Sequence, residues 1–270
     1  MGVRGLMLYC RRIQRRVDIR RKGLNIGIDA FSLIFLFRED RRSFVSYLQG
    51  LKDMEHTITF IMDKRAQKEK KEVVNERKEI RKDAKADATQ LTTFTQTEEY
   101  EELDEQQQRI LNEFIALKQR DAWCLYPEYV KWLKGAIEDL GISFIVAEEE
   151  ADTVLARNSY DAVISSDSDL LILGVKSLWI PRANSLYITE ILREDFLDLL
   201  GLEGEQLYQL AFLCGCDIQP RKIVDIQSAI SLLRFYGSIY RIFERVPSVL
   251  SSDDIDLYKR LRQTAWEMTT

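Results

Sequence analysis

Blocks of apolar and polar residues alternate along this chain and predict strands that alternate with helices. Three short apolar runs, Leu24–Ile28, Thr57–Met62 and Ala162–Ile164, have the length and composition of buried strands. An apolar helix is expected over Ala30–Phe37, directly after the first strand. Because β and α elements alternate, we expect an α/β fold with a central, mostly parallel sheet flanked by helices.

The rest of the pattern is mostly helical. The Arg-rich start of the chain reads as helix-like, and Lys64–Ala88 contains no Gly or Pro and predicts one long helix. A mobile polar loop is expected over Thr89–Glu105. Further helices are expected at 104–118, 128–140, 207–213, 226–235, 239–246 and 254–266, with one or two strands in 177–188 and helix again from 191.

An acidic residue closes each predicted strand. Asp29, Asp63 and Asp167 would meet at one edge of a parallel sheet, and Asp169 would point the same way as Asp167 in extended chain. Such carboxylates repel one another unless a cation lies among them, and Mg2+ or Mn2+ prefers oxygen ligands. The predicted short helix nearby also opens with acids, namely Glu148, Glu149, Glu150 and Asp152.

Two plainer interpretations of these acids stay open. Asp29 is also a good N-cap for the helix that follows it. The acids of 148–152 also suit the positive end of a helix dipole.

Composition and charge narrow the class of protein. The chain has 270 residues, 46% of them apolar and 31% charged, which predicts one or two globular domains. Its longest apolar run, Phe31–Phe37, is too short for a bilayer, and no secretory signal is recognised. Four cysteines without framework spacing and a single His56 argue against disulfides and zinc, so we expect a nuclear or cytoplasmic protein.

The net charge of −5 conceals two basic segments. Residues 4–22 hold eight basic residues and one acid, and residues 64–85 hold ten basic residues and five acids. On a helical wheel of 64–88, the acids fall on one side and Ala66, Val73 and Ile80 form a thin apolar stripe. The basic side would suit a phosphate backbone, although a solvated helix with i,i+4 ion pairs is the alternative. Its members are Lys64, Lys68, Lys71, Lys78 and Lys82, with Lys70, Arg77 and Arg81 beside them.

Together these stretches resemble the flap endonuclease and xeroderma pigmentosum G family of structure-specific 5′-nucleases. The matching strings are MGVRGL at the start, IGIDAF around Asp29, FIMDK at 60–64, EEEAD at 148–152, SSDSDLLILG at 165–174 and LCGCD at 213–217. Lys64 replaces a Gly of the family pattern, and Ile218 replaces a Tyr. The resemblance implies a PIN-like nuclease core over 1–200 with an arch insertion at about 64–140. It also implies a degenerate helix–two-turn–helix-like subdomain over 201–270, with the boundary near Gly201–Gly204.

The resemblance also implies roles for individual residues. Lys70 and Arg77 match the arch residues that act on the scissile phosphate. Gly2, Phe35, Lys71 and Arg81 are expected to contact nucleic acid, with Phe35 stacking on a base and the Gly2 amine near the site. Glu149 and Asp152 have no match in the family. The acids expected to hold two Mg2+ ions, for which Mn2+ can substitute, are Asp29, Asp63, Glu148, Glu150, Asp167, Asp169 and Asp217.

One departure from the family concerns duplex binding. The family has a Gly-x-Gly hairpin that grips duplex backbone beside a K+ ion, whereas residues 223–226 contain no glycine. Asp225 would repel phosphate there, so the K+ site and the tight grip on duplex stay open. We also expect a monomer without a sliding-clamp tail, and the small size suits a viral or fast-diverging protein.

The function expected from these features is Mg2+-dependent hydrolysis of DNA that has a 5′ flap, a nick or a free 5′ end. Such a flap endonuclease or 5′ exonuclease would act in replication, repair or recombination. One alternative is an RNA endonuclease of the same fold. A second alternative is a nuclease-like scaffold that does not cut, which the presence of all seven acids disfavours.

Overall fold

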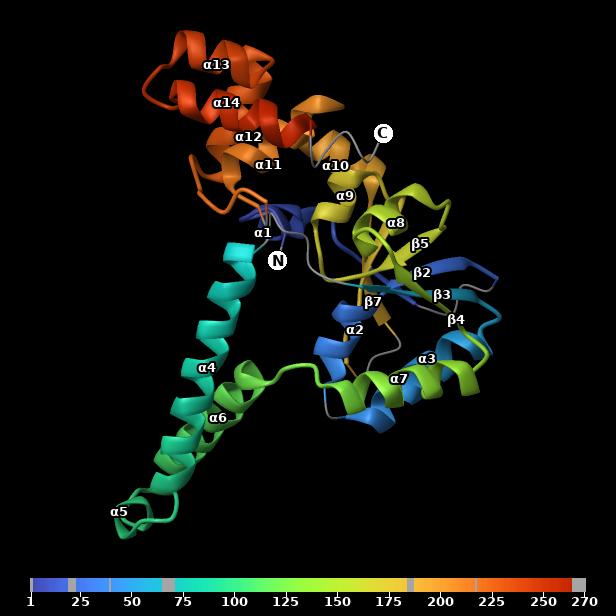
Figure 1. Cartoon of the computed structure of the whole chain (residues 1–270), viewed down its shortest axis with the longest axis vertical. Coiled ribbons are helices and arrows are strands. Elements are labelled where there is room, and N and C mark those ends of the chain that lie inside the picture. The colour runs from blue at the N-terminus through green and yellow to red at the C-terminus, as the bar shows by residue number, and fades with distance from the viewer. Residues whose placement is uncertain are drawn as a thin grey trace. The chain divides into compact units, whose positions relative to one another are not determined.

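The structure, a computed structural model, describes residues 2–18, 23–38, 40–64, 71–183, 187–216 and 218–263, with only the backbone for 71–73. The chain divides into two compact units, shown along the chain in Figure 1. The first contains residues 1–67 and 134–270, and the second contains 68–133. Residues beyond 201 belong to the first unit, and a domain boundary near Gly201 stays a prediction.

A seven-stranded sheet forms the centre of the first unit, in the order β1-β7-β6-β5-β2-β3-β4. The strands β4, β3, β2, β5 and β6 pair in parallel, and β7 and β1 extend one edge in antiparallel pairing. The prediction of an α/β fold with a mostly parallel sheet is confirmed. The strands are β1 (Arg15–Asp18), β2 (Asn25–Asp29), β3 (Thr57–Asp63), β4 (Ser143–Ala147), β5 (Ala162–Ile164), β6 (Ser177–Ile180) and β7 (Tyr187–Leu192).

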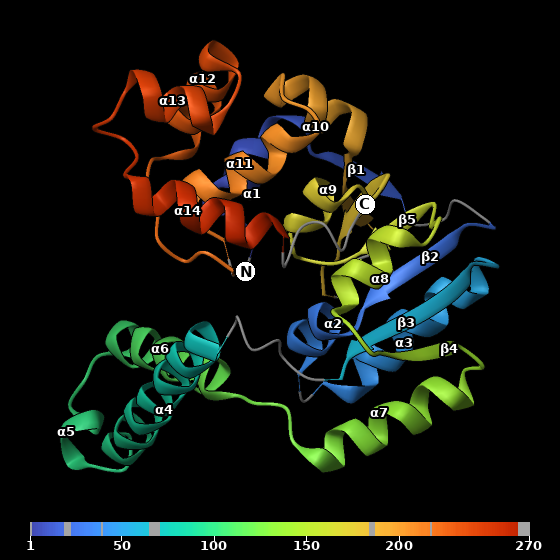
Figure 2. The ribbon, with the colours of Figure 1, turned by 45° about the horizontal axis from the view of Figure 1, so that its top comes forward.

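Helices cover both faces of this sheet because successive residues of each buried strand point to opposite sides. A Cβ on Gly27 of β2 would lie 2.7 Å from Leu155 of α8 (Ala151–Arg157). On the other face, Phe60 of β3 contacts Phe44 of α3 (Arg41–Asp53), with 6.1 Å between ring centroids. Figure 2 shows α8 and α3 on opposite sides of β2 and β3. Asp29 shares the α8 face with Gly27, which places the acids on that side.

The start of the chain differs from the prediction of a helix-like stretch. A short helix α1 (Leu6–Tyr9) and a 3-10 turn η1 (Cys10–Ile13) precede the strand β1. The arginines of β1 are exposed, and the strand exists because it pairs with β7 nearly two hundred residues later, with Arg15 opposite Glu190. Local propensity does not signal such a pairing. Helix α2 (Ala30–Phe37) has the bounds expected from the sequence.

The C-terminal helices match the predicted pattern closely. They extend the hydrophobic core of the first unit, with Phe212, Leu233, Ile242 and Tyr258 buried in one cluster. Burial raises the pKa of the Cys214 thiol in this cluster to about 12, so the thiol stays protonated at neutral pH. These helices are α10 (Arg193–Leu200), α11 (Glu205–Cys214), α12 (Ile226–Tyr236), α13 (Ile239–Arg245) and α14 (Ser252–Leu261). Helix α9 (Asp169–Leu173), which precedes them, was not predicted.

The second unit is a helical hairpin. Helix α4 (Lys71–Phe94) and helix α6 (Glu105–Ala122) pack along each other, joined by the short helix α5 (Glu98–Glu101), and α7 (Pro127–Asp139) follows. The mobile loop expected over 89–105 is wrong, because α4 continues to Phe94. The side chain of Ile80, a member of the thin apolar stripe expected on this helix, is exposed. Ala84 and Ala88 are buried instead, and an ion pair of 2.6 Å joins Lys118 to Asp87.

None of the helices among the described residues has the length and apolar character needed to cross a bilayer.

Candidate active site

The sheet brings the acids of four neighbouring strands to one edge. Asp29, the last residue of β2, lies opposite Ile61 of β3, and Asp63 ends β3 two residues further on. Asp63 in turn lies opposite Ala147, the last residue of β4. Glu148 and Glu150 follow β4, and Asp167 and Asp169 follow β5 on the other side of β2. The carboxyl ends of β4, β3, β2 and β5 therefore form one acidic edge, a name used below for these six residues.

Asp29 lies in a buried hydrogen-bond cluster at this edge. Its Oδ2 accepts hydrogen bonds from the hydroxyls of Ser32 (2.6 Å) and Ser165 (2.9 Å), and its Oδ1 accepts one from the Phe31 N–H (3.0 Å). The last bond makes Asp29 the N-cap of α2, as the plainer interpretation predicted. Burial raises the pKa of Asp29 above its usual 3.8, the two serine hydroxyls oppose the rise, and the charge of Asp167 adds to it. A cation at this edge would stabilise the charged form of Asp29 and so lower its pKa.

The acids around the start of α8 have distinct partners. Asp63 Oδ1 accepts a hydrogen bond of 2.5 Å from the Ala151 N–H. Asp63, the last residue of β3, thereby caps the start of α8. Glu150 occupies the N-cap position of α8 without a side-chain capping bond. Glu149 forms an ion pair of 2.6 Å with Arg157. Glu150 and Asp152 thus lie at the start of α8, which agrees with the helix-dipole interpretation, and the side-chain cap comes from Asp63.

Asp167 and Asp169 do not lie in extended chain, contrary to the prediction. The chain turns after β5 and enters α9 at Asp169, with Ser168 in helical conformation (φ −73°, ψ −17°). The turn is held by the Asp169 N–H, which donates to Asp167 Oδ1 at 2.9 Å, and by the Asp167 N–H, which donates to Ser165 Oγ at 3.0 Å. A turn, rather than strand alternation, therefore gathers these two carboxylates.

The first residues of the chain lie against this turn. The Val3 N–H donates to Asp169 Oδ1 at 2.6 Å. A Cβ on Gly2 would lie 2.5 Å from Asp167 Oδ1 and 2.8 Å from Asp169 Oδ1, so any other residue at position 2 would collide with both carboxylates. The Arg4 N–H donates to the Gly215 carbonyl at 3.0 Å, which ties the same segment to the end of α11. Asp217, the seventh predicted ligand, follows Gly215 by two positions in the sequence and is outside the described residues.

The donor chemistry of the acidic edge fits a hard divalent ion, because its side chains offer carboxylate oxygens only. Their present arrangement does not form a ligand set. Among the described residues, which leave out Asp217, no group of three or more His, Cys, Asp or Glu side chains is placed to hold a metal ion. Donors of the protein occupy the carboxylates instead: Ser32 and Ser165 on Asp29, Ala151 on Asp63, Lys64 on Glu148 and Val3 on Asp169.

Sequence reasoning missed the residues that support the acids. Ser32 and Ser165 bond to Asp29 and lie 3.0 Å from each other, and Ser32 Oγ also accepts from the Ser166 N–H at 2.9 Å. The serines of the SSDSD string were a usable signal, since a serine hydroxyl is a common partner of a buried carboxylate. Ser32 also offered a local signal, because it follows Asp29 by three residues at the start of the predicted helix.

The predicted arch residues fall in or beside the helical hairpin. Lys70 lies outside the described residues, and so does the side chain of Lys71, whose backbone begins α4. Arg77 and Arg81 lie one turn apart on α4, both half-buried, and Arg81 Nε donates to the Arg77 carbonyl at 3.0 Å. Their roles toward a phosphate stay predictions.

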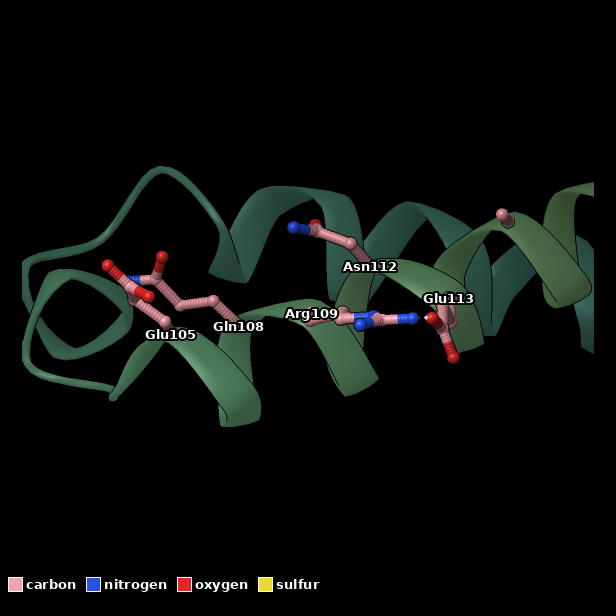
Figure 3. A pocket seen from close by; sticks show the side chains of 6 residues that line it. Glu105, Gln108, Arg109, Asn112 and Glu113 are labelled. Atoms are coloured by element: carbon pink, nitrogen blue, oxygen red, sulfur yellow. Dashed lines mark hydrogen bonds and ion pairs between the residues drawn. The ribbon is translucent and has the colours of Figure 1, made fainter.

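Two further surface features are the predicted stacking residue Phe35 and a hollow on the helical hairpin. Phe35 on α2 is 36% exposed, with its ring centroid 6.1 Å from that of Phe31. A hollow of about 530 Å³ lies along α6 of the hairpin. Figure 3 shows the side chains that line it, including Arg109, which pairs with Glu113. Charged and amide side chains line most of this hollow, and none of them belongs to the acidic edge.

At the position of the missing glycine hairpin, Asp225 caps α12. Its Oδ1 accepts from the N–H groups of Gln227 (3.0 Å) and Ser228 (3.1 Å), and its Oδ2 accepts from the Ser228 hydroxyl (2.6 Å). The bond from that hydroxyl lowers the pKa of Asp225, so the carboxylate is charged at neutral pH. The N–H groups that open α12 are therefore already occupied by an anion of the protein itself.

Comparison with known proteins identifies relatives along the whole chain. The XPG I-region family model matches residues 141–217, a range that includes Glu148, Glu150, Asp167, Asp169 and Asp217. The Exodeoxyribonuclease 1 of Saccharomyces cerevisiae is 27% identical over 90% of this chain, which spans 36% of that protein. The Flap endonuclease 1 of Methanosphaera stadtmanae is 24% identical over 86% of this chain and 75% of its own length.

Solved structures show the same fold. The catalytic core of Rad2 superposes with a TM-score of 0.63 at 18% identity, covering 100% of this chain and 84% of that one. The Methanococcus jannaschii flap endonuclease-1 gives a TM-score of 0.60 at 17% identity, covering 96% of this chain and 84% of that one. A further Rad2 structure, with a TM-score of 0.64 at 16% identity, is in complex with DNA substrate; it covers 99% of this chain and 84% of that one.

Proposed function

Because this chain belongs to the flap endonuclease and xeroderma pigmentosum G family, we propose that it is a divalent-metal-dependent, structure-specific 5′ nuclease that hydrolyses phosphodiester bonds in DNA. The single observation that supports this most strongly is the acidic edge. Six carboxylates that are as much as 140 residues apart in the sequence follow adjacent strands of one sheet. A fold gains no stability from gathering like charges, so their convergence favours a functional requirement for a bound cation.

The side chains proposed to hold two Mg2+ ions take different positions around the edge. Glu148, Glu150, Asp167 and Asp169 would make the closest contacts, and Asp29, Asp63 and Asp217 would orient the ligands and water. Bound ions would supply positive charge for the phosphate oxygens and a water of lowered pKa. Ser32 and Ser165 would hold Asp29 in one orientation, because both of their hydroxyls donate to its Oδ2.

The predicted arch cations would complete the site. Lys70 and Arg77 would stabilise the charge that develops on the phosphate, with an effect of roughly 10²–10³-fold each, typical of a preorganised donor. Phe35 would stack on a base, and Lys71 and Arg81 would contact the backbone of the nucleic acid. A DNA substrate with a 5′ flap, nick or free 5′ end is proposed from the relatives, two of which are flap endonucleases.

A set of labelled substrates tests the proposed activity. Flap, nicked, gapped and single-stranded DNA, and matched RNA, are incubated with the protein in Mg2+, Mn2+ or EDTA. We expect cleavage of 5′-flap DNA in Mg2+ and Mn2+ that leaves a 5′-phosphate, and no cleavage in EDTA. The Asp167→Ala protein should bind the same DNA and fail to cut it. Cleavage by that variant at the normal rate would refute the metal assignment.

The same substrates separate the alternatives. Faster cleavage of single-stranded RNA than of flap DNA would favour the RNA endonuclease, an alternative supported by the negative Asp225 at the start of α12. Tight DNA binding without cleavage in any metal would favour a scaffold. A location in the nucleus or cytoplasm is proposed from the free cysteines and would be checked by imaging of the tagged protein.

Replacing Asp225 with asparagine is expected to strengthen duplex binding by about two- to fivefold, because an exposed carboxylate near a phosphate of like sign repels it only weakly in water. Asparagine is also a good N-cap, so helix α12 should keep its stability. Dissociation constants for blunt duplex DNA at low salt, measured by fluorescence anisotropy, check this. Asp256→Asn on α14 removes an exposed acid elsewhere and serves as the control. Equal affinities for the wild-type and Asp225→Asn proteins would contradict the proposed repulsion.

A further inference from the structure

Lys64 occupies the acidic edge as a cation of the protein itself. Its Nζ lies 2.9 Å from Oε1 and 2.7 Å from Oε2 of Glu148, so it bonds to both oxygens of a predicted metal ligand. Lys64 directly follows Asp63 at the end of β3, and Glu148 directly follows β4, which pairs with β3. The sheet therefore places the ammonium group where β3 and β4 deliver their carboxylates.

The ammonium group and a divalent ion would compete for the same oxygens. Ser32 on Asp29, Ala151 on Asp63 and Val3 on Asp169 are neutral donors, whereas Lys64 carries a full positive charge. While Lys64 bonds to both oxygens of Glu148, that carboxylate is not available to a metal ion.

We propose that Lys64 is a displaceable counter-ion that lowers metal affinity until substrate arrives. The proposal rests on the proposed nuclease function and concerns the regulation of the same site. When a divalent ion binds to Glu148, the Lys64 ammonium is released and stays close to the acidic edge, where the phosphate of the substrate would lie. The negative charge of a phosphodiester there would attract both the divalent ion and the Lys64 ammonium. Metal and DNA should therefore each strengthen the binding of the other.

The exposure of the pair makes such an exchange feasible. The side chains of Lys64 and Glu148 are 54% and 83% exposed. Ion pairs of this kind contribute at most about 1 kcal/mol, which corresponds to about a fivefold change in an equilibrium constant. A dication can therefore displace the lysine at modest cost, and the lysine still changes metal affinity measurably.

Metal titration of the DNA-free protein tests the competition. Calorimetry with Mn2+ at low salt should give about fivefold tighter binding for Lys64→Ala than for wild type, and wild-type-like binding for Lys64→Arg, which keeps the charge. Lys259→Ala is the matched control, because Lys259 is 56% exposed and pairs with Asp256 at 3.4 Å, far along the chain on α14. In a Glu148→Gln background, Lys64→Ala should change the affinity less than twofold.

The titration distinguishes failure of this proposal from failure of the function. If Mn2+ binds in an Asp167-dependent manner and Lys64→Ala leaves the affinity unchanged, the counter-ion role is refuted and the metal site stands. An equal change in Lys259→Ala would also refute that role, because the effect would then be one of overall charge. If no Asp167-dependent binding is found, the proposed metal site itself fails.

Salt dependence of DNA binding tests the release of Lys64. Each phosphate contact contributes about 0.9 to the slope of log K against log salt for duplex DNA. With Ca2+ present, Lys64→Ala should therefore reduce the slope by about 0.9, and in EDTA it should leave the slope unchanged because Glu148 still neutralises the wild-type lysine. The same reduction in both conditions would mean a permanent phosphate contact and would overturn the proposal.

Discussion

The Asp29→Asn protein is expected to lose cleavage by roughly 10²–10³-fold and to melt at a higher temperature than wild type. Both effects arise from one buried carboxylate. Asparagine has the same shape and still accepts the Phe31 N–H bond that caps α2. It lacks the negative charge that a bound cation would need at the end of β2.

The gain in stability follows from the environment of Asp29. The side chain is buried, and its pKa is raised by that burial and by the charge of Asp167. Folding therefore disfavours the charged form, so removal of the charge should stabilise the metal-free protein by about 0.5–2 kcal/mol. The charge of Asp29 would thus favour binding of a cation and lower the stability of the metal-free protein.

The stability difference should depend on pH with a definite sign. A carboxyl whose pKa is raised in the folded state binds more protons there than in the unfolded chain, so the wild type loses stability as pH rises from the unfolded pKa through the folded one. Below that window Asp29 is neutral in both states, and the two proteins should melt alike. Above it the advantage of Asp29→Asn should be complete.

Thermal melts in EDTA from pH 3.5 to pH 8, together with flap cleavage in Mg2+, check both effects. Asp256→Asn, on an exposed residue of α14, is expected to change neither. A protein with Asp29→Asn that melts lower than wild type at pH 8 would show that the hydrogen bonds outweigh the charge. Cleavage at the wild-type rate would show that Asp29 is a cap and nothing more.

A Gly2→Ala protein is expected to lose roughly 10- to 100-fold in cleavage while its melting temperature stays close to that of wild type. The added Cβ would lie 2.5 Å from both Asp167 Oδ1 and Ser168 Oγ, so the proposed ligands must move. Displacements of about 1 Å at a catalytic centre are enough for a loss of about 10²-fold. The collision involves the carboxylates of Asp167 and Asp169 at the acidic edge rather than apolar side chains of the core. The fold itself should therefore tolerate it.

The matched control for this change is Gly50→Ala in α3. A Cβ at Gly50 meets nothing within 4 Å, and alanine in a helix is favoured over glycine by roughly 0.5–1 kcal/mol. Gly50→Ala should therefore melt slightly higher and cut flap DNA normally. If Gly2→Ala also cuts normally, the start of the chain does not set the positions of Asp167 and Asp169.

The strands and the residues that close them were predictable from short stretches of sequence. Buried parallel strands are continuous apolar runs, so the pattern located β2, β3 and β5 and the acids that follow them. The rule that parallel strands present their carboxyl ends at one edge then predicted that Asp29, Asp63 and Asp167 converge. Neither step required knowledge of any contact between distant residues.

Elements that depend on a distant partner were not predictable in the same way. The polar segment 15–18 forms a strand because β7 offers a partner edge, and α4 continues past residue 88 because Ala84 and Ala88 pack in the hairpin. The turn that gathers Asp167 and Asp169 replaced the extended chain expected there. For β1 and α4, contacts with another segment outweighed the local pattern, whereas the turn is held by hydrogen bonds between residues two positions apart.

The same division applies to the chemistry. The amino-acid order alone specified which acids follow which strands, since apolar runs and their ends are local features. Folding in three dimensions established that Ser32 and Ser165 share Asp29, that Gly2 lies against Asp167 and that Lys64 bonds to Glu148. Apart from Ser32 and Asp29, which are three residues apart, these pairs join residues more than eighty positions apart. Their distances depend on how the strands are ordered in the sheet, which no local stretch of sequence encodes.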